Sequence, residues 1–318
     1  MQEMTHKHTR ELDRFYKEHR DSCTNCGEVF RDGMCAHLGY LQDGCSAVLC
    51  DRCSDLLKET VVRYHWQSRK FELPDPNDKL WRYMDLAKLI SLFSTKSLFF
   101  ASAGSFEDPF EGAKGIEARK EKWDSFYLQF FKGAILTAPD GEKKHWTSEE
   151  LEAYAEKLLS QMDKAGEKER KSTYISCWHS NDYESEAMWK LYAVNVTNAI
   201  AIQTTAGKLY EALDRNPYID IGKIKYIDYR NSFAPINGSY WYKRKAFEHE
   251  REVRAILHGF KQIGAGIAVP VDVQTLIERI YISPYAPRWF EDVLRSVMEK
   301  YSIDKPLVRS DMLDKPFY

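Results

Sequence analysis

Six of the seven cysteines in this 318-residue chain lie between Cys23 and Cys53. They include two Cys-x-x-Cys pairs, Cys23 with Cys26 and Cys50 with Cys53. Each pair offers two thiolates from one tight turn, and two such pairs complete the tetrahedral shell that zinc prefers. We expect no export signal, because residues 1–20 are charged and lack an apolar core. The thiols are then expected to stay reduced, which favours metal thiolate over disulfide. The sequence therefore predicts a structural zinc ion held by these four cysteines.

The same stretch contains three further candidate ligands, Cys35, His37 and Cys45. With one more ligand they would hold a second ion; alternatively they are small buried residues of a loop. Gly27 follows the first pair, where a knuckle turn needs a permissive backbone. The arrangement resembles a zinc ribbon or treble clef. Modules of this kind bind DNA, RNA, protein or only their own chain, so the metal predicts a scaffold and leaves its role open.

Composition limits the partners that the chain is expected to have. Apolar residues make up 43% and charged residues 30%, which is typical of a folded globular protein. The net charge of -2 lacks the basic surplus used in non-specific phosphate binding, so any nucleic-acid contact must be local. A basic segment between Lys243 and Arg254 is one candidate, and a solvated charged face is the simpler interpretation. No apolar run is long enough to span a bilayer. We expect a cytoplasmic protein without membrane association and leave the oligomeric state open.

The rest of the chain predicts two folded parts. Residues 1–65 form a zinc-binding module with an N-terminal helix, 66–79 form a linker interrupted by Pro74 and Pro76, and 80–318 form a larger domain. Helices are predicted after Asp85, after Thr147, whose capping box is completed by Glu150, and from Pro287; a further helix start is predicted at Ser54. Strands are predicted at 97–103, 173–178, 199–203, 223–229, 253–257, 267–271 and 279–282. Because the strands do not alternate regularly with helices, the fold class is α+β, a mixed sheet with flanking helices.

Three segments contain more reactive side chains than a core needs. Residues 106–111 place carboxylates directly after a strand, where a solvated turn is the simpler interpretation. In residues 176–180, strand alternation puts Ser176, Trp178 and Ser180 on one face and Cys177 and His179 on the other. Cys177 and His179 lie too close in a strand to face each other, so Cys177 is interpreted as core. No Walker-type or Rossmann-type glycine loop is present, which argues against hydrolysis of nucleoside triphosphates.

The third segment, residues 248–254, is predicted as a strand with Glu248, Glu250, Glu252 and Arg254 on one face. Like charges at that spacing repel unless they are solvated, paired or occupied by a ligand. An edge strand facing water explains the pattern. The functional alternative is a carboxylate pair that binds a sugar hydroxyl and stabilises positive charge as a glycosidic bond breaks, with Arg254 keeping its neighbour ionised.

These segments, together with residues 81–83, 98–102 and 188–193, resemble in type and order the prokaryotic family catalogued as domain of unknown function 2971, over residues 80–285. That family name implies no activity. A more distant likeness is to ADP-ribosyltransferases, whose first strand carries an Arg or His and whose last carries Glu-x-Glu. The likeness implies that Arg82 contacts the phosphates or ribose of NAD. It also implies that Glu252 stabilises the oxocarbenium-like centre and that Glu250 positions the acceptor.

The leading hypothesis is therefore an enzyme acting at an N-glycosidic bond, most simply an ADP-ribosyltransferase-like toxin or defence protein that uses NAD. The predicted catalytic residues are Glu252, Glu250 and Arg82. The predicted substrate-binding residues are Tyr83, Asp108, Ser176, Trp178, Trp189, Tyr192 and Arg254.

Three alternatives remain open. The first is a DNA or RNA base glycosylase in anti-phage defence, with the zinc module holding the nucleic acid. The second is a metal-dependent nuclease in which divalent ions are shared by Asp108, Glu111, Glu250 and Glu252. The third is a recognition module without catalysis.

Overall fold

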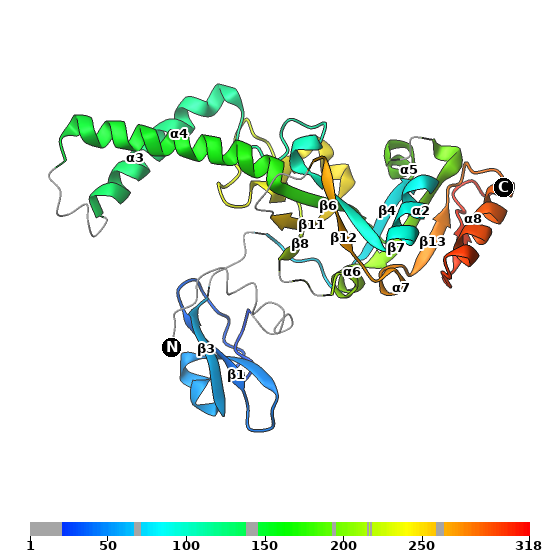
Figure 1. Cartoon of the computed structure of the whole chain (residues 1–318), viewed down its shortest axis with the longest axis horizontal. Coiled ribbons are helices and arrows are strands. Elements are labelled where there is room, and N and C mark those ends of the chain that lie inside the picture. Colours follow the sequence, from blue (N-terminus) through cyan, green and yellow to red (C-terminus); the bar gives the residue numbers. More distant parts are fainter. Residues whose placement is uncertain are drawn as a thin grey trace.

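The computed structural model describes residues 21–66, 71–137, 146–192, 195–214, 216, 218–258 and 264–318. It confirms the α+β class: a small cysteine-rich module precedes a larger mixed sheet with flanking helices (Figure 1). The helix expected near the N-terminus falls on residues 1–20, outside the described residues. The linker boundary at 66–79 stays a prediction, since 67–70 are also outside them.

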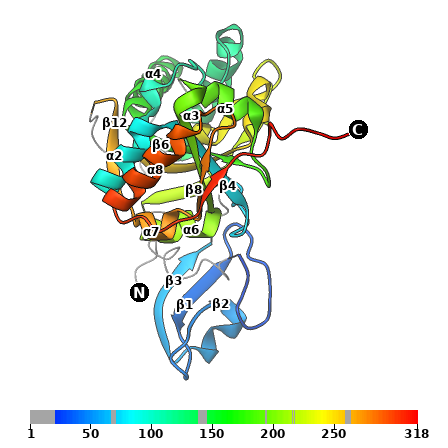
Figure 2. The same cartoon turned by 90° about the vertical axis from the view of Figure 1, so that its right-hand side faces the viewer.

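The cysteine-rich module is built on a three-stranded antiparallel sheet with the order β2-β1-β3. Its strands are β1 (Cys35–Tyr40), β2 (Ser46–Cys50) and β3 (Glu59–His65). A 3-10 helix, Asp51–Leu56, follows β2 where the sequence predicts a helix start at Ser54. Leu38, Leu49 and Tyr64 are buried in its small core. The module forms a body of its own beneath the large sheet in Figure 2.

The large sheet has nine strands, in the order β12-β5-β6-β4-β7-β13-β14, with β11 on β6 and β8 on β11. All pairs are antiparallel except β13 with β14. The strands are β4 (Lys79–Asp85), β5 (Ser97–Ser102), β6 (Thr173–Ser180), β7 (Ala199–Thr205), β8 (Ile219–Lys223), β11 (Glu252–His258), β12 (Gly266–Pro270), β13 (Arg279–Ile282) and β14 (Leu307–Arg309). A separate parallel pair joins β9 (Lys225–Ile227) to β10 (Tyr242–Arg244).

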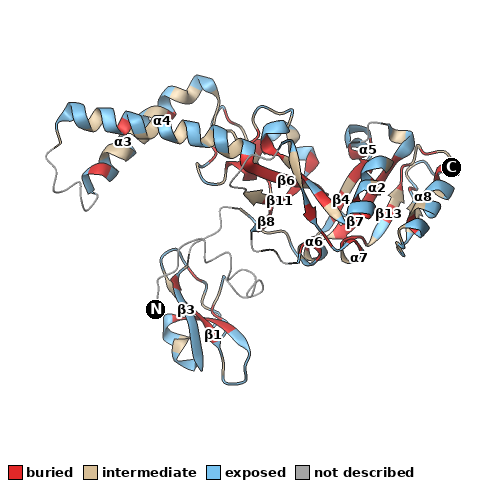
Figure 3. Ribbon diagram, in the orientation of Figure 1, coloured by how far each residue is buried: buried red, intermediate tan, exposed pale blue. Residues whose placement is uncertain are grey.

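Helices cover both faces of the β4–β7 part of this sheet. Side chains alternate along a strand, so Leu80 and Met84 of β4 enter the main core while Trp81 and Tyr83 enter a second one. The main core is closed by α2 (Leu86–Thr95), α6 (Ala206–Ala212), α7 (Val273–Leu276) and α8 (Trp289–Lys300). The second core is closed by α5 (Glu186–Tyr192), through Met188 and Trp189. Figure 3 shows the buried strands between these helices.

Two long helices, α3 (Lys120–Thr137) and α4 (Ser148–Ser172), project from the sheet as a hairpin (Figure 1). The capping box predicted at Thr147 and Glu150 is confirmed: each side chain bonds the other's backbone N–H. No helix in the described part of the chain has the length and apolar character needed to cross a bilayer.

Three local predictions are wrong. The strand expected at 223–229 is divided into β8 and β9, which belong to different sheets. The last helix begins at Trp289 rather than at Pro287. The strand expected over 248–254 begins only at Glu252, because Lys245–Glu250 is a 3-10 helix and Arg251 adopts a left-handed conformation with φ of 41°. The strand that begins at Glu252, β11, is not an edge strand facing solvent, because it pairs with β6 on one side and with β8 on the other.

Candidate active site and metal centre

A fork in the large sheet opens a pocket. β6 pairs with β5 through Tyr174 and Ile175, and with β4 through His179 and Ser180. The segment 176–178 lies between these two pairings, where β4 and β5 diverge. The pocket has a volume of about 390 Å³, within the usual range for small-molecule sites. It is lined by Trp81, Arg82, Tyr83, Met84, Lys88, Ser91, Leu92, Ser97, Leu98, Phe99, Ala101, Phe106, Ile175, Cys177, Trp178, His179, Met188, Tyr192, Glu250 and Glu252.

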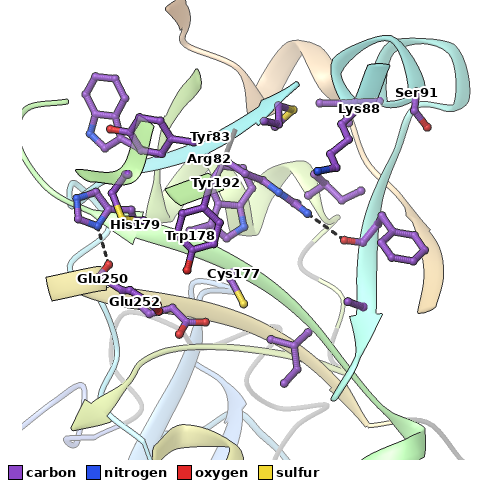
Figure 4. A pocket seen from close by; sticks show the side chains of 18 of the residues that line it. Arg82, Tyr83, Lys88, Ser91, Cys177, Trp178, His179, Tyr192, Glu250 and Glu252 are labelled. Atoms are coloured by element: carbon purple, nitrogen blue, oxygen red, sulfur yellow. Dashed lines mark hydrogen bonds between the residues drawn. The ribbon is translucent and has the colours of Figure 1, made fainter. Parts of the chain in front are cut away.

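Arg82 of β4 and Glu252 of β11, which lie far apart in the chain, therefore line the same pocket. Figure 4 shows Arg82 on one side of Trp178 and Tyr192, and the two glutamates on the other. Glu250 shares the pocket with them. Arg82, Glu250 and Glu252, the three residues that the sequence predicts to be catalytic, therefore line one pocket.

The acidic side of the pocket belongs to a cluster of five buried charges, Glu111, Arg254, Glu252, Lys243 and Glu250, which we call the charge cluster. Arg254 is fully buried and donates to Glu252 from Nε at 2.7 Å and from Nη2 at 3.1 Å. Its other side binds both carboxylate oxygens of Glu111. Lys243 donates to Glu252 at 3.2 Å and makes a short contact with Glu250. Three carboxylates face two cations, so the cluster has one negative charge in excess.

The two cations keep Glu252 ionised. Burial alone would raise its pKa, but the charges of Arg254 and Lys243 outweigh burial and lower the pKa to about 2. Burial likewise opposes the charge on Lys243, and Glu252 reverses that effect, so the pKa of Lys243 is raised. The acidic wall therefore carries fixed charge at neutral pH, and Tyr226 supports it by accepting the Glu252 backbone N–H at 2.8 Å.

The opposite wall carries a cation without an acidic partner. Arg82 donates to Ser176 Oγ at 2.8 Å and to the Phe99 carbonyl at 3.1 Å, and lies 5.6 Å from the centre of the Trp178 ring. Within the described residues no carboxylate pairs with it. Burial lowers the pKa of Arg82, because removal from water disfavours the charged guanidinium. Its neutral hydrogen-bond partners, Ser176 and the Phe99 carbonyl, compensate that cost only in part. An anionic group is the natural ligand for such a guanidinium.

The predicted substrate-binding residues divide into two groups. Tyr83, Trp178 and Tyr192 line the pocket, and Tyr83 also accepts the Ser185 backbone N–H at 2.9 Å. The remaining four lie outside the lining: Asp108, Ser176, Trp189 and Arg254.

Each of those four has another contact. Ser176 lies behind Arg82 and orients it, and Arg254 lies behind Glu252. Trp189 is buried and donates to Glu184 at 3.0 Å. Asp108 pairs with Arg244 at 2.8 Å.

Sequence reasoning missed several residues of this site. Cys177, interpreted as core, lines the pocket, and burial together with the Glu252 charge raises the pKa of its thiol. His179 also lines it; its Nδ1 donates to the Glu250 carbonyl at 2.6 Å, and burial lowers its pKa. Lys243 was grouped with a solvated basic face, yet it is buried between two glutamates. No local pattern identifies Lys243, because its partners come from another element.

A second, polar pocket of about 320 Å³ lies against Glu252. Its lining includes Lys79, Asn181, Tyr226, Arg251 and Glu252. Arg251 is exposed and contacts only the amide oxygen of Asn181, at 3.3 Å, and Lys79 only the Asp182 carbonyl, at 3.5 Å. In the part of the chain that the structure describes, neither cation has a carboxylate partner. Glu252 is thus shared by two pockets of different character.

The cysteine module contains a geometry suited to zinc. The Sγ atoms of Cys23, Cys26, Cys50 and Cys53 all lie within 4.8 Å of one another, and those of Cys26 and Cys50 are 3.8 Å apart. Tetrahedral zinc with Zn–S bonds of about 2.3 Å places its sulfurs roughly 3.8 Å apart. Burial would raise the pKa of Cys23, but backbone N–H groups outweigh burial and lower it to about 7, which favours thiolate. The four cysteines fit the predicted ion.

The second predicted ligand group is arranged differently from the expectation. Cys35 and His37 lie close to Asp51 and form a possible ligand group with it. Cys45 is exposed and belongs neither to this group nor to the group of four cysteines. His37 Nε2 lies 2.8 Å from Asp51, and Arg63 Nε donates to Cys35 Sγ at 2.8 Å. These contacts already satisfy the three groups, and a second ion stays a prediction.

No protein-family model matches the chain, so the resemblance to the domain of unknown function 2971 is not confirmed. No curated protein matches the chain either. Among solved structures, Thermus sp. 2.9 DarT in complex with NAD+ is similar with a TM-score of 0.34 and 8% identity, over 75% of this chain and 97% of that one. The same protein in complex with ADP-ribosylated ssDNA gives 0.33 and 10%, over 76% and 97%. Its complex with carba-NAD+ gives 0.32 and 8%, over 74% and 96%. Similarity this distant carries no weight for the chemistry of the site.

Proposed function

We propose that the chain cleaves the N-glycosidic bond of NAD and transfers ADP-ribose to a macromolecule. The observation that supports this most is that the ionised Glu252 and Arg82, which no described carboxylate pairs with, line one pocket. A dinucleotide with anionic phosphates and a cationic nicotinamide ring presents both charges that this pocket complements. Trp178 and Tyr192, between the two walls, offer aromatic surface to a planar ring.

The reaction places charge where the site can stabilise it. The bond between ribose C1′ and the pyridinium nitrogen breaks, and its electron pair leaves with neutral nicotinamide. Positive charge then develops on the ribose ring, next to Glu250 and Glu252. A carboxylate that is already ionised and held in place needs no reorganisation to stabilise that charge. The excess negative charge of the charge cluster also stabilises the positive charge on the ribose. The acceptor attacks C1′ and releases its proton.

The polar pocket gives the acceptor a route to the same carbon. It shares Glu252 with the first pocket, and it exposes Arg251 and Lys79, two cations that have no carboxylate partner among the described residues. These cations favour an anionic acceptor, and a nucleic acid is the macromolecule of that chemistry. A contact of nucleic acid at this pocket would be local, as expected for a chain whose net charge of -2 lacks a basic surplus.

The charge cluster disfavours the nuclease alternative. Glu111, Glu250 and Glu252 are already bridged by Arg254 and Lys243, and Asp108 by Arg244. Divalent ions would have to displace buried cations to be shared by these carboxylates.

The test is incubation of the purified protein with nicotinamide-labelled NAD and single-stranded or duplex nucleic acid. We expect nicotinamide release and labelled acceptor when the label is moved to the ADP-ribose. Glu252→Gln should lower the rate roughly 100- to 1,000-fold. Glu248→Gln, an exposed position in the same segment, is the matched control and should leave it unchanged. Abasic sites formed without NAD would instead indicate a base glycosylase and refute the transferase.

A further inference from the structure

The polar pocket beside Glu252 lacks the surface on which a nucleobase binds. Proteins hold single bases chiefly by stacking them on aromatic side chains. Among the described residues that line this pocket, Tyr226 is the single aromatic one, and its hydroxyl is engaged by the Glu252 backbone N–H. Apart from Ile224 and Val253, the remaining side chains of the lining are polar or charged. A small, strongly polar group therefore suits this pocket better than a planar ring.

The charges that the polar pocket offers to a ligand are mainly positive. Arg251 and Lys79 are exposed and contact only neutral oxygens within the described part of the chain. Lys223 and Asp78 pair with each other at 3.1 Å. Asp182 also lines the pocket, and no described cation pairs with it. Two cations thus face one carboxylate, which favours an anionic ligand.

The backbone of Arg251 is strained. Its φ of 41° lies in the left-handed region, where the chain end of a helix usually has glycine or asparagine. Its side chain has a single contact, with the amide oxygen of Asn181 at 3.3 Å. A guanidinium in a strained position with so few contacts, placed between Glu250 and Glu252 in the chain, is open to a ligand of the site.

The polar pocket is poorly equipped to take a proton from a neutral acceptor. An efficient general base has a pKa near the working pH, whereas the pKa of Glu252 is about 2. Burial raises the pKa of Tyr226, so its hydroxyl keeps its proton at neutral pH. Asp78 is bound by Lys223, and no histidine is found among the described residues of the lining. An acceptor that is already anionic needs no base.

We propose that the acceptor is a terminal phosphate of a nucleic acid strand. This inference rests on the proposed transfer of ADP-ribose from NAD. A terminal phosphate monoester carries a charge of about −1.5 to −2 at pH 7, whereas an internal phosphodiester carries a single charge and is the weaker nucleophile. Its proton is lost in solution, before the strand binds.

The step is balanced without a base in the pocket. One oxygen of the phosphate dianion attacks C1′ as the bond from C1′ to the pyridinium nitrogen breaks, and the electron pair of that bond leaves with neutral nicotinamide. The product is a phosphodiester that joins the strand to ADP-ribose. Arg251 and Lys79 would bind the other phosphate oxygens and offset their repulsion from Glu252, which both pockets share.

The experiment compares three oligonucleotides of one sequence, with a 5′-phosphate, with a 3′-phosphate, or with hydroxyl groups at both ends. Each is incubated with the full zinc-loaded chain and NAD labelled in its ADP-ribose. At least one phosphorylated strand should be labelled at least about 100-fold faster than the hydroxyl-ended strand, which would need a general base. Its phosphate should also become resistant to phosphatase, because it is now a diester.

Two negative results have different meanings. Equal labelling of the three strands would overturn the terminal phosphate as acceptor and leave transfer from NAD standing. Absence of nicotinamide release with every strand would remove the proposed function, and this inference with it.

Three variants separate recognition of the phosphate from stability of the fold. Arg251→Gly should raise the KM for the phosphorylated strand at least about tenfold, yet raise the melting temperature, because glycine adopts a φ of 41° without strain. Lys96→Gly is the matched control: Lys96 is an exposed cation with a φ of 48° at the end of α2, so the variant should raise the melting temperature and leave the KM unchanged. Asp182→Asn should lower the KM by removing a repulsive charge. If it abolishes transfer instead, Asp182 is the base for a neutral acceptor and the proposal is wrong.

Discussion

The ionised state of Glu252 makes a quantitative prediction about acid stability. Its pKa is about 2 in the folded chain against a usual value of 4.5. A depressed folded-state pKa stabilises the fold fully above the unfolded pKa, and this contribution is lost as pH falls through the folded pKa. The difference of about 2.5 units corresponds to about 3 kcal/mol, lost between about pH 5 and pH 2. Near pH 3.5, about 1 kcal/mol of it should already be gone.

Glu252→Gln separates this contribution from all others. Near neutral pH the variant leaves Arg254 and Lys243 without one carboxylate, and removing one partner from a buried ion pair costs about 3–5 kcal/mol. As pH falls, wild-type Glu252 takes up a proton and loses the same interaction. The stability difference between wild type and variant should therefore shrink by about 1 kcal/mol between about pH 7 and pH 3.5.

The assay is urea unfolding of both proteins at matched pH values, followed by tryptophan fluorescence. Acid also releases thiolate-bound zinc, but that loss is common to both proteins and cancels in the difference. Glu248→Gln, which is exposed, should track the wild type at every pH. If the difference between wild type and Glu252→Gln stays constant across the range, Glu252 titrates normally and the charge cluster does not hold it ionised.

Three further predictions follow from the site and the module. Arg82→Lys loses the fork that bonds Ser176 and Phe99, and should weaken NAD binding at least about tenfold in calorimetry; unchanged affinity would place the phosphates elsewhere. Cys50→Ser, or chelation, should release about one zinc per chain and abolish proteolytic resistance of residues 21–66 first; an intact module would exclude a structural metal. Cys177 should alkylate slowly near pH 8 because its pKa is raised, and Glu252→Gln should accelerate it; equal rates in peptide mapping would contradict their proximity.

The sequence predicts those features that short-range patterns determine. Two Cys-x-x-Cys turns specify a metal centre because each turn positions its own two ligands, whatever lies between the pairs. The capping box at Thr147 is equally local. The strand boundaries near Ile224 and Arg251 were wrong, because sheet partners and one left-handed residue decide them, and neither leaves a periodic signal.

The pocket depends on pairings that sequence periodicity cannot reveal. The fork exists because β6 exchanges β5 for β4 along its length, and these strands lie far from β6 in the chain. Alternation along β6 did correctly place Ser176 and Trp178 together: the indole donates to the hydroxyl at 3.2 Å. It could not reveal that Ser176 also orients Arg82, which arrives from β4.

For the acidic segment 248–254, the structure decides how the carboxylates are stabilised, which the sequence pattern leaves open. Carboxylates at alternate positions must be solvated, paired or occupied, and the sequence left solvation on an edge strand and a functional carboxylate pair both open. Burial of Glu250 and Glu252 excludes that solution, and Lys243 and Arg254 supply the pairing. Pairing stays incomplete, because Glu111 competes for Arg254 and leaves the five charges one cation short. A cluster retained only for stability would gain from neutrality. The residual negative charge beside the pocket is therefore what a site needs if its ligand becomes cationic during the reaction.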